Sequence, residues 1–194
     1  MSAFELYLRL GIDHIMDLKG YDHILFIITL CSVYKLSEWK RVLILITAFT
    51  LGHSVTLALA TLNLVSVSTG LIEFLIPLTI FLTALFNAIN KGVNVNKLLH
   101  TIKFIAALFF GLIHGLGFSN YLRSLLGQES SIWKPLLSFN IGIEIGQVII
   151  VAIIMCITWL VVSIFKAPRR EWNLLLSGVG LGIALILMIE RLPW

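Results

Sequence analysis

Three histidines lie inside strongly apolar stretches of the chain, where an ionisable side chain is costly. They are His23 in G-Y-D-H-I-L-F, His53 in F-T-L-G-H-S-V and His114 in F-G-L-I-H-G-L-G-F, and Glu144 lies in a fourth such stretch, F-N-I-G-I-E-I-G-Q. Ionisable groups at membrane depth usually face the protein interior and serve a function. Imidazole nitrogens together with carboxylate oxygens form a ligand set for a divalent transition metal. These four side chains, with Asp22 beside His23, are the predicted metal ligands.

The composition places these residues in a membrane protein. Of the 194 residues, 59% are hydrophobic and 12% are charged, and the mean hydropathy is +1.01. A soluble domain of this length cannot bury so much apolar surface. The apolar blocks reach the roughly 20 residues that a helix needs to cross a bilayer. We therefore predict one all-α transmembrane domain over residues 1–194, with the lipid bilayer as its partner and no nucleic acid, despite the net charge of +4.

Six transmembrane spans are predicted, and the basic residues between them set their orientation. The spans lie near residues 21–34, 39–62, 69–90, 97–119, 132–165 and 172–189. Basic residues follow the odd-numbered spans, namely Lys35, Lys40, Arg41, Lys91, Lys97, Lys166, Arg169 and Arg170. Cytoplasmic connectors carry an excess of Lys and Arg, so these connectors are expected inside and both termini outside.

The first span is too short to cross alone, so the segment before it must contribute. Residues 1–19 carry apolar side chains at helical spacing. They predict either an amphipathic helix on the outer surface or a half-helix that dips in and meets the first span at Gly20. The phrase G-I-D-H, which ends at His14, echoes G-Y-D-H, which ends at His23. His14 and Asp17, one turn apart, could form an entry site for the metal.

Helical rise places the predicted ligands at one level of the membrane. His53 and His114 lie roughly 20 and 25 Å from the cytoplasmic ends of their spans, and Glu144 lies about 16 Å below the outer end of its span. All fall between the membrane middle and the outer surface. Three further polar residues near this level are expected to support the ligands: Ser54, Glu73 and Asn140.

Other polar and small residues in the spans are expected to hold helices together. Side-chain hydrogen bonds between helices are the interpretation of Thr47, Thr50, Asn87 and Gln147. Three G-x-x-x-G pairs predict close helix contacts. They are Gly111 with Gly115, Gly142 with Gly146, and Gly178 with Gly182.

The four phrases around His23, His53, His114 and Glu144, in this order, resemble the HupE/UreJ family of small bacterial membrane proteins. The resemblance extends from about residue 11 to about residue 147. The family is associated with hydrogenase and urease accessory functions and is regarded as comprising nickel or cobalt permeases. It implies a place in the bacterial inner membrane. It also implies metal-handling roles for Asp22, His23, His53, His114 and Glu144.

Three functions are compatible with these residues. The first is a permease for a divalent metal such as nickel, cobalt or zinc. The second is an intramembrane zinc-dependent hydrolase acting on a lipid or acyl substrate, in which Glu144 or Asp22 would be the general base for a metal-bound water. The third is a structural or partner-binding protein whose histidines join helices by hydrogen bonds. A homo-oligomer is compatible with all three.

Overall fold

The computed structural model is an all-α bundle that describes residues 2–90, 95–126 and 132–193. Seven α-helices follow one another in these residues: α1 (Ala3–Met16), α2 (Asp22–Cys31), α3 (Trp39–Thr61), α4 (Thr69–Ile89), α5 (Lys97–Leu126), α6 (Trp133–Trp159) and α7 (Arg169–Glu190). A 3-10 turn, η1 (Leu36–Glu38), precedes α3, and a π-helical turn, η2 (Leu160–Ile164), extends α6. The all-α prediction is confirmed.

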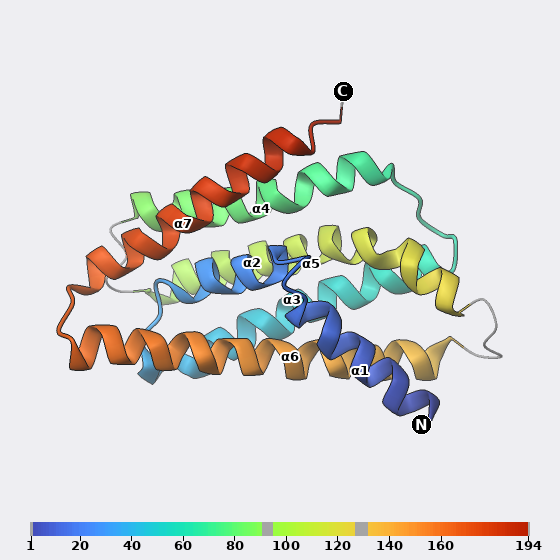
Figure 1. The fold of residues 1–194 in the computed structure, drawn as a ribbon, viewed down its shortest axis with the longest axis horizontal. Coiled ribbons are helices and arrows are strands. Elements are labelled where there is room, and N and C mark those ends of the chain that lie inside the picture. Colours follow the sequence, from blue (N-terminus) through green and yellow to red (C-terminus); the bar gives the residue numbers. More distant parts are fainter. Residues whose placement is uncertain (1, 91–94, 127–131, 194) are drawn as a thin grey trace.

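Five of these helices are long and apolar enough to cross a membrane: α3, α4, α5, α6 with η2, and α7. The first predicted span corresponds to α2, which has only 10 residues. In Figure 1, α1 runs inward from the right-hand end of the bundle, and α2 continues from the middle toward the left-hand end. The two short helices together therefore extend along most of the bundle, as expected for a half-helix that meets a second short helix.

The break between α1 and α2 has a local cause. Asp17 leaves the helical conformation, with φ −65° and ψ 116°. Its Oδ1 accepts a hydrogen bond of 2.8 Å from the backbone N–H of Lys19, which favours a turn over another helical residue. The chain re-enters a helix at Asp22, whose carboxylate lies in the first turn of α2. A carboxylate is stabilised there by the positive end of the helix dipole.

Helices α3 and α5 approach each other to backbone contact. A Cβ atom on Gly52 would lie 2.2 Å from the carbonyl oxygen of Leu108, and one on Gly111 would lie 2.1 Å from that of Phe49. Gly115 is similarly close to the backbone of α3. No side chain fits at these distances, so the predicted close contact at the first G-x-x-x-G pair is confirmed.

Helices α1 and α6 cross in the same way. A Cβ atom on Gly11 would lie 2.1 Å from the carbonyl oxygen of Phe139, and one on Gly142 would lie 2.1 Å from that of Leu8. The glycines thus seat α1 directly on the backbone of α6. This crossing fixes the position of the N-terminal helix, which has only 14 residues.

The third G-x-x-x-G pair does not form a close contact. Nothing lies within 4 Å of a Cβ atom built on Gly178 or Gly182, whereas one on Gly180 would lie 2.3 Å from Cγ2 of Thr29. Gly178 and Gly182 are on the exposed side of α7. The expectation of close packing was wrong for this pair within the described chain, because α7 turns the residue between them toward the bundle.

The predicted side-chain hydrogen bonds between helices are present. Thr50 of α3 donates to Oε1 of Gln147 on α6 at 2.8 Å. Thr47, one turn before Thr50 on α3, donates to Glu144 of α6. Asn87 of α4 donates to the carbonyl oxygen of Thr29 on α2 at 2.7 Å. These bonds satisfy polar groups that would otherwise be unpaired in an apolar medium.

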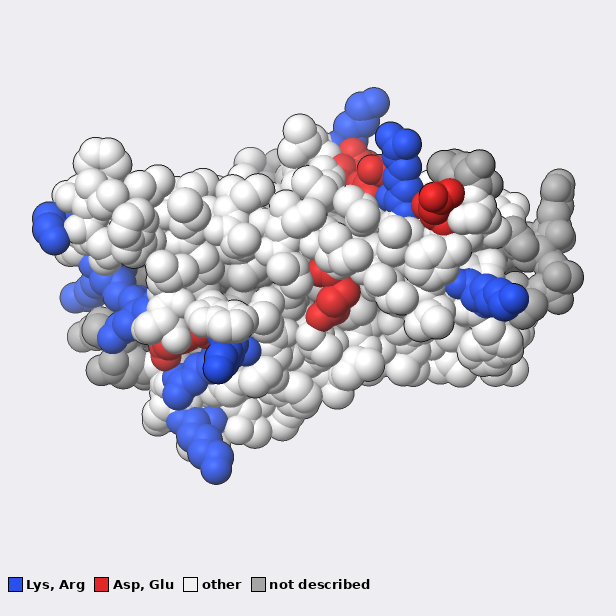
Figure 2. Space-filling model, turned by 90° about the horizontal axis from the view of Figure 1, so that it is seen from below, with Lys and Arg blue, Asp and Glu red and all other residues white. Residues whose placement is uncertain are grey.

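The basic connectors lie at one end of the bundle. The ends of α2, α4 and η2 and the starts of α3, α5 and α7 are at the left in Figure 1. Figure 2, which keeps the same horizontal axis, shows Lys and Arg side chains gathered at this end, carboxylates near the middle and a mixed group of both charges toward the other end. Lys91 lies outside the described residues. This distribution is that of a multi-pass membrane protein.

Candidate metal centre

Three histidines from three different helices come together in the bundle. His14 is in the last turn of α1, His23 in the first turn of α2, and His53 in the middle of α3. The ring centroids of His14 and His23 are 4.7 Å apart, and those of His14 and His53 are 6.0 Å apart. One nitrogen from each ring lies within 4.8 Å of the other two. We call this group the histidine cluster.

Most ring nitrogens of the cluster lack a hydrogen-bond partner among the described residues. Nε2 of His14 and both ring nitrogens of His23 and His53 are buried without a hydrogen bond among the described residues. A buried polar group without a partner is costly, and native structures contain few of them. Neutral imidazole offers a lone pair at one nitrogen. Three such rings in one place can therefore offer one lone pair each to a shared ligand.

The spacing of the three nitrogens suits a divalent transition metal. Metal–nitrogen bonds to histidine are about 2.0–2.1 Å for zinc, so an ion at the centre would draw each nitrogen inward by roughly 1 Å or less. The rings need only a side-chain adjustment of this size. The cluster thus has the donor type, number and spacing for such an ion, and its residues do not distinguish nickel, cobalt and zinc.

His114 lies beside the cluster and is oriented by the backbone. Its ring centroid is 5.3 Å from that of His23. Its Nδ1 is 2.8 Å from the carbonyl oxygen of Phe110. Because a carbonyl only accepts, Nδ1 must carry the proton, which leaves a lone pair on the buried and unpaired Nε2. His114 is therefore prepared as a neutral nitrogen donor next to the three clustered rings.

Aromatic side chains form the walls around these rings. The ring centroid of Phe118 is 3.9 Å from that of His14, and the ring centroid of Phe49 is 4.9 Å from that of His114. His53 and His114 have exposed fractions of 0% and 1%. Such walls limit the access of water and lower the local dielectric, which strengthens the interaction of a cation with its ligands.

Asp22 contacts the cluster through His23. Its Oδ1 lies 3.0 Å from Nδ1 of His23, within ion-pair distance but not aligned as a hydrogen bond. Its Oδ2 lies 3.7 Å from Nη1 of Arg191. Arg191 was not among the predicted site residues. Its position two residues beyond the last predicted span was the available signal, because a basic residue at a helix end can turn back along the bundle.

A cavity of about 330 Å³ leads to the cluster. Its charged and polar lining includes two of the clustered histidines, His114, three carboxylates and one guanidinium. These residues are His14, Asp17, Asp22, His23, Glu73, His114 and Arg191. Asp17 and Glu73 are exposed, whereas Asp22 is largely buried. The cavity thus joins the surface to the histidines along a path that carries negative charge.

Other predicted site residues lie elsewhere. Glu144 accepts a hydrogen bond from Thr47 at the α3–α6 contact and does not line this cavity. Ser54 donates to the carbonyl oxygen of Thr50 at 2.6 Å. Oδ1 of Asn140 is buried without a partner among the described residues. Roles for these residues in the site stay predictions.

His14, which the sequence predicts in an entry site for the metal, lies within the histidine cluster itself. The seating of α1 on α6 carries its ring between Phe118 and His23. The echo of G-x-D-H at positions 11–14 and 20–23 was the sequence signal for this arrangement. The two aspartates differ, however, because Asp13 is exposed and pairs with Arg9 at 3.9 Å.

Comparison with known proteins gave one family match. The family described as HupE / UreJ protein matches residues 1–191, which is nearly the whole chain. Neither the curated proteins nor the solved structures searched gave a match. The matched range includes the three clustered histidines and His114.

Proposed function

Because the chain belongs to the HupE/UreJ family, we propose that it binds a nickel or cobalt ion at the histidine cluster and transports it across the membrane. The observation that carries the proposal is the convergence of buried, unpaired nitrogens from His14, His23 and His53. Metal binding would supply the missing partners. The metal is cargo in this proposal, so the ligands must release it as well as hold it.

Capture would begin in the acidic cavity. Asp17 and Glu73 are exposed at its lining and would attract a hydrated divalent cation. Asp22, deeper in the cavity, is 3.0 Å from His23 and would help to replace the hydration shell. Arg191 reaches the same carboxylate at 3.7 Å. Its charge opposes that of the ion and would weaken binding, which favours release.

A route inward would follow the contact between α3 and α6. Thr50 and Thr47 precede His53 by three and six residues, about 4.5 and 9 Å closer to the basic end of the bundle. Thr50 bonds to Gln147 and Thr47 to Glu144. These oxygens form a polar group between α3 and α6, beside the turns of α3 that precede His53. Hydroxyl, amide and carboxylate oxygens can hold a divalent ion in passing.

The direction of the route follows from the connector charges. We propose that the basic end of the bundle faces the cytoplasm of a bacterial cell and that both termini lie outside. The acidic cavity would then open on the outer side. A reporter fused to each terminus, with one active only in the cytoplasm and one active only outside it, would test this orientation.

Uptake of ⁶³Ni²⁺ into proteoliposomes tests the transport proposal. We expect His53→Ala and His114→Ala to abolish uptake. His100→Ala is the matched control, since this histidine of the same α5 helix lies away from the cluster and contacts the hydroxyl of Tyr34 at 3.2 Å. Uptake that persists unchanged in both His53→Ala and His114→Ala would overturn the proposal. Equal loss in the control would point to a general effect of removing a histidine.

A metal-dependent hydrolase is the second candidate. The observation in its favour is a carboxylate, Asp22, at the wall of the cavity and 3.0 Å from a clustered histidine, where it could act as a base for a metal-bound water. This candidate predicts that zinc-loaded protein releases fatty acid from lipid or acyl esters without moving metal across the membrane. Metal uptake without ester cleavage would exclude it.

A further inference from the structure

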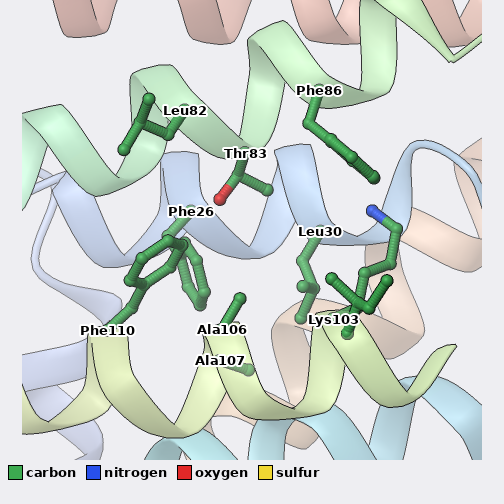
Figure 3. A pocket seen from close by; sticks show the side chains of 10 residues that line it. Phe26, Leu30, Leu82, Thr83, Phe86, Lys103, Ala106, Ala107 and Phe110 are labelled. Atoms are coloured by element: carbon green, nitrogen blue, oxygen red, sulfur yellow. The ribbon is translucent and has the colours of Figure 1, made fainter. Parts of the chain in front are cut away.

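A second cavity lies away from the acidic one, between α2, α4 and α5. Its volume is about 270 Å³, and nearly all of its lining is apolar. Figure 3 shows Phe26 and Phe110 at one end and Phe86 with Lys103 at the other. On α5 the lining residues Lys103, Ala106 and Phe110 recur at helical spacing, and the small side chain of Ala106 leaves the space open.

Lys103 is unusual in this setting because its charge has no counter-charge in the part of the chain that the structure describes. Its side chain is buried, with 6% exposed. The ammonium donates a hydrogen bond to Oδ1 of Asn87 and lies 5.3 Å from the ring centroid of Phe86. Within residues 2–90, 95–126 and 132–193 no carboxylate lies within ion-pair distance of it. A buried cation paired only with an amide and a ring is costly.

We infer that this cavity binds a long-chain fatty acid, with the carboxylate on Lys103 and the acyl chain lying along Ala106 toward Phe110. The ammonium has three donors, of which Asn87 takes one, so two remain for an anion. The volume is too small for the two chains and glycerol of a phospholipid. It takes the carboxylate and the first part of one acyl chain, and the remainder would extend past the exposed lining residues Leu82, Phe86 and Ile102 into the bilayer. Lys103 lies six residues, about 9 Å, beyond the start of α5 and therefore inside the apolar part of the bundle. A lipid can bring only a small headgroup to this depth.

The far end of the cavity adjoins the metal centre. The ring of Phe26, which lines the cavity, has its centroid 5.8 Å from that of His114. Phe110 lines the cavity with its side chain and holds Nδ1 of His114 with its carbonyl oxygen. A bound acyl chain would therefore press on residues that orient a nitrogen donor. The binding inference itself does not depend on metal transport.

Binding of radiolabelled palmitate to the full chain in phosphatidylcholine nanodiscs tests the inference. We expect saturable binding of one palmitate per chain. Lys103→Met should weaken it at least about tenfold, the size expected for loss of a hydrogen bond to a charged group. Lys97→Met is the matched control, because this exposed lysine of the same helix does not line the cavity. It should leave the affinity unchanged.

Two further arms separate charge from shape. Methyl palmitate, which lacks the charge, should bind wild type about as weakly as palmitate binds Lys103→Met. Ala106→Phe fills the cavity, keeps the lysine and should abolish binding, so it tests the site even where Lys103→Met fails to fold. Equal affinities for wild type and Lys103→Met would overturn the inference. So would unchanged binding to Ala106→Phe, or displacement of palmitate by phosphatidylglycerol at lower concentrations than by palmitate itself.

Discussion

Two buried polar centres lie in the bundle, and they differ in how their hydrogen bonds are satisfied. The inner centre is a network around Asn87, which accepts from Lys103 through its side chain and from Nδ2 of Asn173 through its backbone at 3.2 Å. Ser177 donates to Oδ1 of Asn173 at 3.2 Å. The histidine cluster, in contrast, leaves most of its ring nitrogens without partners.

The difference separates a structural centre from a ligand site. Amides and hydroxyls that pair with one another hold helices together without a ligand, and removing one member leaves the others unsatisfied. Histidines that converge without pairing cost stability in the free protein and recover it when a ligand binds. Variants of the two centres should therefore fail in different assays.

The largest effect is expected for His23→Ala. His23 faces both other clustered rings, and its loss should weaken nickel binding at least about 100-fold, because even residues that only support ligands account for 10- to 100-fold. The thermal stability of the free protein should change little. Isothermal titration calorimetry of the detergent-solubilised protein measures the affinity, with His100→Ala as control. A clear loss of apo-protein stability with intact metal affinity would show that the histidine cluster is a structural centre like the Asn87 network.

Asn87→Leu should affect stability and leave metal binding intact. It removes the acceptor of a buried ammonium and the donor to Thr29, at an expected cost of about 2–4 kcal/mol in the free energy of unfolding. Asn90→Leu, at the exposed end of the same helix, is the matched control. Denaturant unfolding followed by circular dichroism gives the free energies. Loss of metal affinity in correctly folded Asn87→Leu would show that the two centres are one functional unit.

Gly111→Ala and Gly178→Ala form a pair that tests the support of the cluster. The added methyl at Gly111 meets the backbone of α3, whereas that at Gly178 meets nothing within 4 Å. We expect Gly111→Ala to lower the free energy of unfolding by about 1–3 kcal/mol and to weaken metal binding, because α3 carries His53. Gly178→Ala should be neutral or stabilise its helix by up to about 1 kcal/mol. Equal effects would mean that the α3–α5 contact is not specific.

The smallest effect is expected for Arg191→Gln. Arg191 is 3.7 Å from Asp22, and 30% of its side chain is exposed. Removing a partly exposed positive charge near a cation site should raise metal affinity about two- to fivefold at low salt. The gain should fade at high ionic strength because salt screens such charges. A decrease in affinity would indicate that Arg191 orients Asp22 and does not oppose the ion.

Hydropathy and connector charge predicted much of this fold, because both depend on composition along the chain. The long helices and the basic end of the bundle follow directly from such patterns. The sequence pattern of the N-terminal helix is compatible both with a helix on the outer surface and with a half-helix that dips into the membrane. Its position depends on its contact with α6 through Gly11 and Gly142. A single sequence does not reveal such a contact between distant segments.

The candidate site was predictable only in part. His23 and His53 were predicted at one level and have ring centroids 6.4 Å apart, whereas Glu144, predicted at the same level, contacts Thr47. Successive helical residues point about 100° apart, so a depth estimate gives no information on which neighbour a side chain faces. The rotation of each helix is set by its glycine contacts and its packing. The pairing of Lys103 with Asn87 was not predicted for the same reason, because it depends on which faces α5 and α4 turn toward each other.

The seating of α1 on α6 has a consequence for biosynthesis. His14 is among the first residues made, but the surface that positions it belongs to α6, which is made much later. Chains grow from the N-terminus and their early segments wait for later ones. The nascent protein can therefore present two or three separate histidines but no assembled cluster until α6 has been synthesised. The proposed metal site would therefore form only after α6 has been made, and a shorter chain would not hold the ion there.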